Sequence, residues 1–469
     1  MAAFTRLTAQ DASFLHIETP NAPMHVGSLG IFEAGPFQDD QGRFRLEDAR
    51  RLIESRLDLV PRFRQKLMHV PFGQGRPVWV DDDRFDLNFH VRLTALPRPG
   101  DEQQLKALMA RLQAQPLDRN RPLWELWFVE GLEGDRVAII QKTHHALIDG
   151  ISGVDVAVVL LDLEPKEPPS PGEITPWEPT PGPSPAQLLT ETLVERATQP
   201  AEMVRTLRAA VRGPRQVVEQ ARDVGKAVAA IGAVGAPRMP FNQPIGPHRR
   251  FEMARASLDT VKAVRQAYGC TINDVVLAAV AGGLRHFLTE ADISVQDLVL
   301  RALIPVSVRS EDEQGTLGNR VAAMFAELPV GEADPSERVR TLHEQLKDLK
   351  ESGQAVGVDR MVGLLEYAPP TLLSLAARLL PFQRSMNLVV TNVPGPQFPL
   401  YCMGARLLEA FPYVGIADNL ALVVAVVSYD GTLGFGLTSD RDLMPDLPVL
   451  AEGIEKAVAE LAAAAKGGS

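Results

Sequence analysis

Apolar and polar positions alternate in short runs along the chain, and longer stretches repeat with helical spacing. Together these patterns predict a mixed α and β structure in both halves. Strands are predicted at 89–93, 137–143, 298–308, 388–391, 421–429 and 432–438. Helices are predicted at 46–58, 103–113, 154–163, 258–268, 273–288 and 336–350. Asp430-Gly431, between the last two strands, predicts a hairpin turn.

A proline-rich stretch divides the chain into two candidate domains. Nine of the 21 residues from Pro165 to Pro185 are proline, among Glu, Ser, Thr and Gly. This composition favours an extended, semi-rigid linker. A length of 469 residues also exceeds what one core usually organises. We therefore predict a first domain over 1–164, a linker with connecting helices over 165–245, and a second domain over 246–469.

Two stretches bear on contact with a membrane. Residues 186–231 suggest helices and hold the densest basic residues of the chain: Arg205, Arg208, Arg212, Arg215, Arg222 and Lys226. That segment suits either an anionic membrane surface or a solvated connector. The apolar stretch 361–382 is interrupted by Glu366, Arg378 and the pair Pro369-Pro370. It predicts two helical pieces, either in the core or near an apolar channel or membrane surface.

Charge and cysteine content narrow the class of protein. The formal net charge is −11, which argues against a nucleic-acid partner because phosphate binding needs a concentrated basic surface. Two cysteines in so long a chain form no disulfide framework and fit a reducing compartment. Residues 1–14 show no basic segment followed by an apolar one, so no secretory leader is expected. We expect a cytoplasmic protein, with peripheral attachment to the inner face of the plasma membrane or to lipid bodies as an extension.

The pattern His-His-x-x-x-Asp-Gly, at His144, His145, Asp149 and Gly150, is the strongest chemical signal. It follows a predicted strand, where successive side chains point to opposite faces, so one histidine is chemical and the other supportive. An imidazole can take a proton from a hydroxyl group and deliver it to a leaving thiolate. Asp149 would hold the loop and Gly150 would permit its backbone conformation. Adjacent diverging histidines and two widely separated cysteines do not favour a metal site.

This pattern resembles the signature of the CoA-dependent acyltransferase superfamily, and further blocks resemble the bacterial bifunctional wax ester synthase and diacylglycerol acyltransferase family. These blocks are residues 23–27, Pro122-Leu123-Trp124, Asn273-Asp274, residues 304–309, and Asn392-Val393-Pro394-Gly395-Pro396. They follow one another in the family's order. Structural readings stay open beside the functional ones: a core aromatic at Trp124, a helix N-cap at Asn273, and a rigid turn at Asn392 to Pro396.

The resemblance implies two α/β sandwich domains like chloramphenicol acetyltransferase, with the active site in a channel between them. It implies acyl-CoA as co-substrate, no bound cofactor, and diacylglycerol or a long-chain alcohol as acceptor. His145 would be the general base, because superfamily members with a single histidine keep the one separated by three residues from Asp-Gly. Asn273, or a backbone N–H near it, is the candidate oxyanion donor. Asp274, Pro122, Leu123, Trp124, Asn392, Pro394 and Gly395 are candidate binding or channel residues.

Two alternatives share the same fold. A condensation-type acyltransferase would use a carrier-protein thioester or a specialised alcohol, although the chain has no room for an adenylation or carrier domain. A non-catalytic protein would bind an acyl ligand, but it would not need the intact histidine motif. The sequence does not rank the acceptors, because an apolar pocket discriminates by only about 1 to 3 kcal/mol per methylene.

Overall fold

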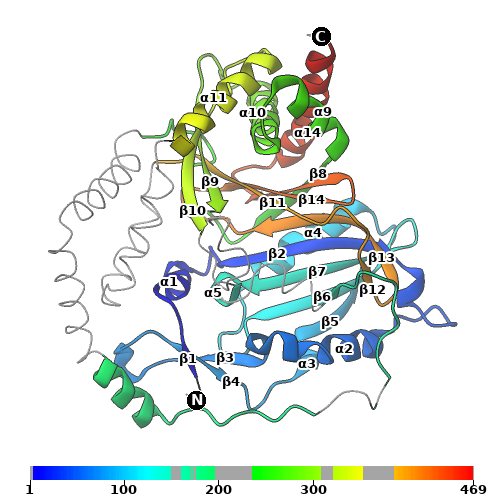
Figure 1. The fold of residues 1–469 in the computed structure, drawn as a ribbon, viewed down its shortest axis with the longest axis vertical. Helices are drawn as coiled ribbons and strands as arrows, with labels where there is room; N and C mark the ends of the chain where they lie inside the picture. The colour runs from blue at the N-terminus through cyan, green and yellow to red at the C-terminus, as the bar shows by residue number, and fades with distance from the viewer. Residues whose placement is uncertain are drawn as a thin grey trace.

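Two six-stranded sheets and one small sheet organise the chain. The computed structural model describes residues 4–148, 160–170, 172, 176–195, 235–307, 321–351 and 385–467. In Figure 1 the two large sheets lie one above the other, with one group of helices above the upper sheet and α2 and α3 below the lower one. The structure is therefore the mixed α and β fold with two sheet-rich halves that the sequence predicted.

The first sheet has the strand order β12-β13-β2-β7-β6-β5. Its strands are β2 (His25–Glu33), β5 (Val91–Ala95), β6 (Trp124–Leu132), β7 (Arg136–His144), β12 (Tyr401–Cys402) and β13 (Ala405–Val414). The central strand β7 is antiparallel to both of its neighbours, and Val137 to His144 are all buried along it. A strand covered on both faces is expected to be rich in branched apolar residues, as β7 is.

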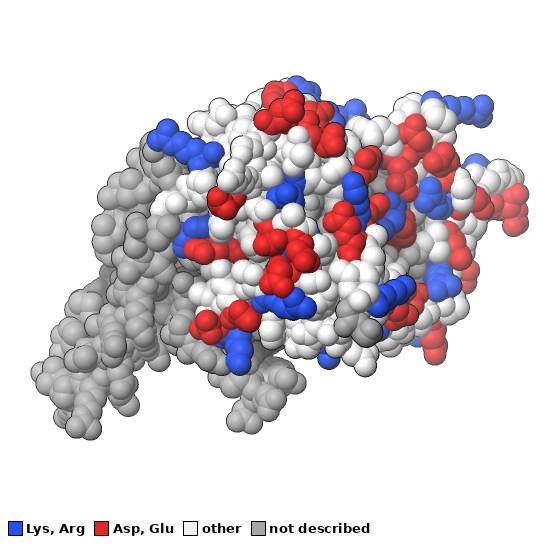
Figure 2. Space-filling model, turned by 90° about the horizontal axis from the view of Figure 1, so that it is seen from above, with Lys and Arg blue, Asp and Glu red and all other residues white. Residues whose placement is uncertain are grey.

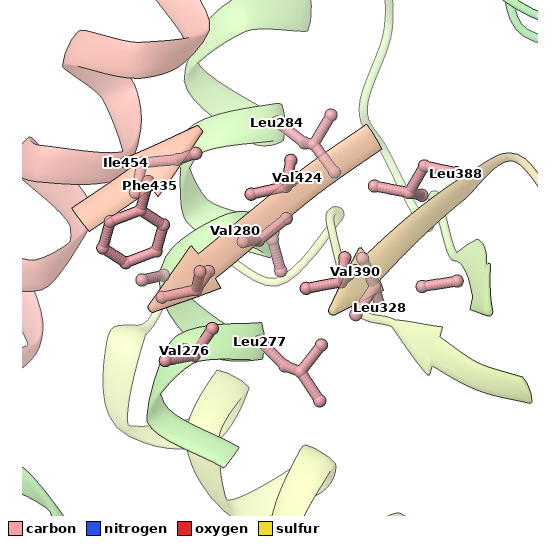
Figure 3. Packing of buried hydrophobic residues seen from close by; sticks show 14 of the residues in the cluster. Val276, Leu277, Val280, Leu284, Leu328, Leu388, Val390, Val424, Phe435 and Ile454 are labelled. Atoms are coloured by element: carbon pink, nitrogen blue, oxygen red, sulfur yellow. The ribbon is translucent and has the colours of Figure 1, made fainter. Parts of the chain in front are cut away.

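The second sheet has the order β10-β9-β11-β14-β15-β8. Its strands are β8 (Arg249–Ser257), β9 (Leu300–Ser307), β10 (Val321–Leu328), β11 (Leu388–Pro394), β14 (Leu422–Tyr429) and β15 (Thr432–Asp440). Between β14 and β15 the Asp430-Gly431 pair has positive φ at both residues, which confirms the predicted hairpin turn. Figure 3 shows Val276, Val280 and Leu284 packed against Val424 and Val390 of this sheet.

The described helices pack against the sheets, and α4 contacts both large sheets. They are α1 (Ala9–Ile17), α2 (Leu46–Glu54), α3 (Leu87–His90), α4 (Glu102–Ala114), α5 (His145–Ile148), α9 (Leu258–Tyr268), α10 (Ile272–Glu290), α11 (Pro335–Glu351) and α14 (Leu447–Gly467). Short 3-10 turns are η1 (Gly35–Phe37), η2 (Leu57–Leu59), η3 (Pro61–Arg64) and η4 (Pro71–Gly73). The small sheet, in the order β1-β4-β3, joins β1 (Thr5–Arg6), β4 (Val78–Asp81) and β3 (Gln65–Met68).

The second half of the sequence contributes two strands to the first sheet. Strands β12 and β13 belong to the second half of the sequence but complete the first sheet, where β13 pairs with β2. The contact between β13 and β15 is so close that a Cβ at Gly434 or Gly436 would overlap the carbonyl oxygens of Ala410 or Pro412. The proposed boundary at residue 246 stays a prediction, and the first sheet draws strands from both sides of it.

Helix α4 contacts both large sheets through an apolar cluster and a neighbouring group of ion pairs. Leu105, Met109 and Leu112 of α4 belong to one buried cluster with Phe251 of β8 and Phe411 of β13. Beside this cluster the Arg255 side chain lies 2.5 Å from one Glu409 carboxylate oxygen and 2.8 Å from a Glu102 oxygen. On the described part of the face in Figure 2, acidic and basic side chains are interspersed over the surface.

Most predicted elements are confirmed, with differences at their ends. The helix predicted at 46–58 ends at Glu54, and η2 replaces its last turn. The strand predicted at 89–93 is wrong in its first two residues, because Asp86 caps a short helix, α3, before β5 begins at Val91. The sequence did not indicate the strands β1, β2, β3, β4, β6, β8, β10, β12 and β13 or the helices α1, α3, α5 and α14. Residues 196–231, 361–382 and most of 154–163 lie outside the described residues.

Within the described residues, no single helix is both long and apolar enough to cross a membrane. Among these described helices, α9 and α10 are long and apolar enough only when they are taken together, and the chain bends by 104° between them. Most of α10 is buried in the core of the second half, as expected for a core helix. The described parts of the proline-rich linker contain no strand or helix up to residue 184, and a helix follows at 185–195.

Candidate active site

The two histidines of the motif lie where β7 ends. His144 is the last residue of the strand and His145 is the first residue of α5. The backbone N–H of His144 donates to the Leu123 carbonyl at 3.0 Å, and that of His145 donates to the Met24 carbonyl at 2.8 Å. The change from strand to helix between them places the two imidazoles in different surroundings.

His144 is a buried structural residue with both ring nitrogens engaged. It is 1% exposed, its Nε2 lies 3.0 Å from Glu18 Oε2, and the Ala146 backbone N–H donates to its Nδ1 at 3.0 Å. Because Nδ1 accepts a hydrogen bond, it carries no proton, and the ring proton is on Nε2 and donates to Glu18. His144 therefore links Glu18 to the first turn of α5.

Glu18 is a residue of the site that sequence reasoning missed. Its side chain is 8% exposed, and its carboxylate also accepts from the Met24 backbone N–H at 2.9 Å and from Arg119 at 2.8 Å. Burial alone would raise its pKa, but the bonds from His144, Met24 and Arg119 outweigh it and lower the pKa to about 2. Glu18 lies 126 residues before His144, so no local pattern could have linked them.

His145 is half-buried against an aromatic ring. The Phe14 and His145 rings are stacked, with centroids 3.9 Å apart and planes at 21°. Nδ1 is buried and makes no well-formed hydrogen bond to the described residues. Burial lowers the pKa of His145 to about 4, and its own backbone carbonyl opposes this only in part. The ring is therefore neutral at neutral pH, which is the form that can accept a proton.

The face of β7 that carries His144 is packed with polar groups under α4. Lys142, 1% exposed, donates to the carbonyls of Leu112 and Gln115 at the end of α4, and burial lowers its pKa to about 8. His25 of β2 lies opposite His144 in the register, with ring centroids 6.1 Å apart. Burial holds the pKa of His25 well below its ordinary value. This face packs the end of β7 against the end of α4.

Pro122, Leu123 and Trp124 are buried in the first half, and their assignment to binding or to a channel stays a prediction. All three are buried, and Trp124 Nε1 donates to the Phe63 carbonyl at 2.8 Å. Its ring stacks on His90, whose Nδ1 donates to the Trp124 carbonyl at 2.8 Å. A buried indole needs an acceptor for its N–H, and Trp124 has found one inside the domain. The block contacts the site through the Leu123 carbonyl, which accepts from the His144 N–H.

Asn273 and Asp274 lie in the first turn of α10. The N-cap is Thr271, not Asn273, and Asp274 closes a capping box with it. Asp274 also accepts from His343 Nδ1 of α11 at 2.7 Å and is 1% exposed, so it ties two helices together. Asn273 is half-buried. No hydrogen bond or ion pair recorded between described residues joins either side chain to His145.

Asn392, Pro394 and Gly395 lie at the end of β11 and just beyond it. Asn392 is half-buried and Pro394 is exposed. The Gly395 backbone N–H donates to Ser428 Oγ at 3.1 Å, and a Cβ at this position would overlap the Ser428 carbonyl oxygen. Gln397 also donates to Ser428 Oγ, and its own carbonyl group accepts from the Gly431 N–H. The block is therefore a rigid turn fixed onto the β14–β15 hairpin.

Asp149 and Gly150 lie outside the described residues, so their roles stay predictions. Among the residues that are described, no group of three His, Cys, Asp or Glu side chains could hold a metal ion. Both cysteines are buried thiols, and burial raises the pKa of Cys402 to about 12. The chemistry that this geometry can perform is proton transfer by a neutral, apolar-packed imidazole.

Comparisons with known proteins agree with this geometry. The chain matches the model of the wax ester synthase/diacylglycerol acyltransferase catalytic domain over residues 7–276 and that of the C-terminal domain over 317–462. It is 36% identical over 464 residues to a probable diacylglycerol O-acyltransferase of Mycobacterium tuberculosis, covering 98% of this chain and 96% of the relative. A second probable diacylglycerol O-acyltransferase of that organism is 35% identical over 96% and 97% of the two chains.

Solved structures give the same answer for the fold. The wax ester synthase/diacylglycerol acyltransferase from Marinobacter aquaeolei VT8 superposes with a TM-score of 0.70 at 29% identity, covering 98% of this chain and 100% of that one. A trichothecene 15-O-acetyltransferase from Fusarium sporotrichioides, at 14% identity and a TM-score of 0.64, shares the fold. The histidine pair at the end of β7, the order of the sequence blocks and these matches show that the chain belongs to the wax ester synthase/diacylglycerol acyltransferase family.

Proposed function

We propose that the protein transfers a long-chain acyl group from acyl-CoA to the hydroxyl of diacylglycerol, of a long-chain alcohol, or of both. The observation that carries this proposal is His145, a neutral imidazole stacked on Phe14 at the end of β7, with its orientation held by backbone bonds. Membership of the family supplies the substrate class.

The proposed reaction is a direct transfer with one general base. Because Nδ1 of His145 is buried, Nε2 is the nitrogen that takes the hydroxyl proton as the acceptor oxygen attacks the thioester carbonyl. The tetrahedral intermediate then expels the CoA thiolate, which leaves with the proton from His145. The ester bond forms as the thioester bond breaks, and no acyl-enzyme is needed. General acid–base assistance of this kind contributes about 10² to 10⁴ in rate.

The oxyanion and the substrate channel complete the proposal. Asn273, half-buried in the first turn of α10, or a backbone N–H beside it, is the proposed oxyanion donor. Helix N-termini favour negative charge, which supports this position. The channel is proposed between the two halves, with acyl-CoA and the acceptor entering from opposite sides. Asn392 and Pro394 at the end of β11 are proposed to border it.

The proposed location is cytoplasmic, with peripheral contact to a membrane or a lipid body. Diacylglycerol and long-chain alcohols reside in such apolar phases, so an enzyme that uses them needs access to the surface. The exposed Phe72 supports this contact: it is 87% exposed on η4, with a backbone φ of 58°. A large apolar side chain presented on a turn suits insertion among lipids.

Product analysis tests the function. The purified protein is given palmitoyl-CoA with equimolar hexadecanol and diolein, and esters are identified by mass spectrometry. We expect triacylglycerol or wax ester from the parent and from His248→Ala, an exposed-histidine control, and none from His145→Ala. Substantial activity in folded His145→Ala would contradict the assignment of the base. Ester formation only with an acyl-carrier protein would favour the condensation-type alternative, and binding without turnover would favour a non-catalytic protein.

A further inference from the structure

We infer that the C-terminal turn of α1 is a positioning device for the histidine pair, with Glu18 acting through His144 on His145. This inference rests on the proposed function and adds residues to it. Helix α1 carries both contacts: Phe14 stacks on His145, and Glu18, the C-cap residue four positions later, binds His144. Residues four apart lie on the same side of a helix, so one turn reaches both imidazoles.

Three hydrogen bonds from Arg119 and one bond within the helix hold this turn in place. The Glu18 backbone N–H donates to the Phe14 carbonyl at 3.1 Å, which joins the two contact residues. Arg119 donates through Nε at 3.1 Å and through a terminal nitrogen at 2.8 Å to Glu18 Oε1. That terminal nitrogen also donates to the Leu15 carbonyl at 3.0 Å, at the end of α1. Arg119 therefore holds the carboxylate and the helix end together.

The same turn is tied to the backbone that carries His145. Glu18 Oε2 accepts from the Met24 N–H, and the Met24 carbonyl accepts from the His145 N–H. On the other side, His144 Nδ1 accepts from the Ala146 N–H, one residue after His145. Both neighbours of the catalytic ring are thus connected to one carboxylate. A shift of Glu18 is transmitted to His145 through two short routes.

The chemistry requires a carboxylate at position 18. The Glu18 carboxylate accepts four hydrogen bonds, one from His144, one from Met24 and two from Arg119, and an ionised carboxylate has no proton to donate. A glutamine would have to turn its NH₂ group either toward Arg119 or toward His144. In the first orientation the glutamine NH₂ group would face the N–H donors of Arg119. The second forces the His144 proton onto Nδ1, where it meets the Ala146 N–H.

The test compares Glu18→Gln with Glu18→Asp, and uses Glu133→Gln as the matched control. Glu133 is an exposed carboxylate on the turn at the other end of β7. For Glu18→Gln we expect kcat to fall by about 10²-fold, the loss typical of a misplaced catalytic group, with KM for acyl-CoA unchanged. Glu18→Asp should recover part of that loss because it restores the carboxylate. Glu133→Gln should behave like the parent.

A second readout separates positioning from simple loss of structure. Spectra of ¹⁵N-labelled histidine should report the Nε2-protonated form of His144 in the parent and its loss in folded Glu18→Gln. Unchanged kcat in Glu18→Gln, or an unchanged His144 proton position, would overturn the inference. If that variant does not fold, Arg119→Lys replaces it, because it keeps the carboxylate but loses a donor to Glu18. Its kcat should fall while the His144 proton stays on Nε2, and an unchanged kcat would overturn the inference.

Failure of this inference is distinguishable from failure of the proposed function. The histidine spectra need no substrate, so they report on the link between Glu18 and His144 even if the parent forms no ester. An inactive parent with the expected His144 proton position would refute the proposed substrates and leave the link standing. If the parent is active and the Glu18 variants have the same kcat, the link between Glu18 and His145 is refuted and the proposed function stands.

Discussion

Removing the ring of Phe14 should shift the acid limit of the reaction. Burial lowers the pKa of His145 to about 4, and the stacked Phe14 ring covers one face of the imidazole. Against an ordinary pKa of about 6.5, this corresponds to about 3 kcal/mol in favour of the neutral form. At pH 5.5 the buried ring is about 97% neutral, whereas a solvated one is about 9% neutral. Phe14→Ser admits water to the ring and should therefore raise the pKa toward the ordinary value.

The assay compares kcat/KM at pH 5.5 and pH 7.5, because this parameter reports ionisation of the free enzyme. The parent should keep nearly all of its activity at pH 5.5, and Phe14→Ser should lose up to about tenfold between the two pH values. Phe14→Leu is the matched control, since it keeps an apolar cover and should behave like the parent. Esters are quantified by mass spectrometry, because thiol reagents do not work reliably in acid.

One result would refute the reasoning directly. If the parent loses activity with an apparent pKa near 6.5, burial does not hold His145 in its neutral form, or a different group is the base. Samples held at pH 5.5 and returned to pH 7.5 should regain full activity, which excludes irreversible loss near the isoelectric point of about 5.4. An acid limit that is equal in all three proteins would show that Phe14 does not shield the ring.

Three further predictions concern stability. Gly436→Ala should unfold at markedly lower urea concentration than the parent, because its Cβ would overlap a backbone carbonyl of β13, whereas Gly35→Ala, with open space around it, should not. Asp274→Ala should lower the free energy of unfolding by about 1 to 2 kcal/mol, as measured by urea titration, because it removes the Asp274 half of the α10 capping box and the bond from His343. For His90, burial lowers the pKa to about 4, so the unfolded chain binds a proton that the native state does not, and stability falls as pH drops from about 6.5 to 4, by about 1.4 kcal/mol per unit. His90→Asn should show a shallower fall in the same titrations.

Local pattern was enough where the neighbours in sequence supply the contacts. The predicted helix at 258–268 matches α9 at both ends, because Ser257 caps it and Gly269 ends it in the left-handed conformation. The hairpin at Asp430-Gly431 follows from backbone preferences of two residues. At 89–93 the same reasoning failed, because the Asp86 side chain bonded to the Asn88 N–H and started a helical turn before the strand.

The contacts of single candidate residues could not be predicted from the sequence, because their partners lie far away in the chain. For Trp124 the sequence left a channel residue and a core aromatic open, and the structure shows its contacts with the Phe63 carbonyl and the His90 ring. For Asp274 the predicted binding or channel role stays a prediction, and the structure adds its capping box with Thr271 and its bond from His343. The one-letter patterns do not contain these partners, which lie 61 and 69 residues away in the chain.

The sequence by itself determined the class of fold, the family and the histidine pair, because hydrophobic periodicity and a compact motif are properties of neighbouring residues. Tertiary structure alone decided that β13 completes the first sheet, that His144 is held by Glu18, and that Phe14 shields His145. Those contacts join segments more than a hundred residues apart. They form only when packing brings the segments together, since no local preference of either segment encodes the other's position.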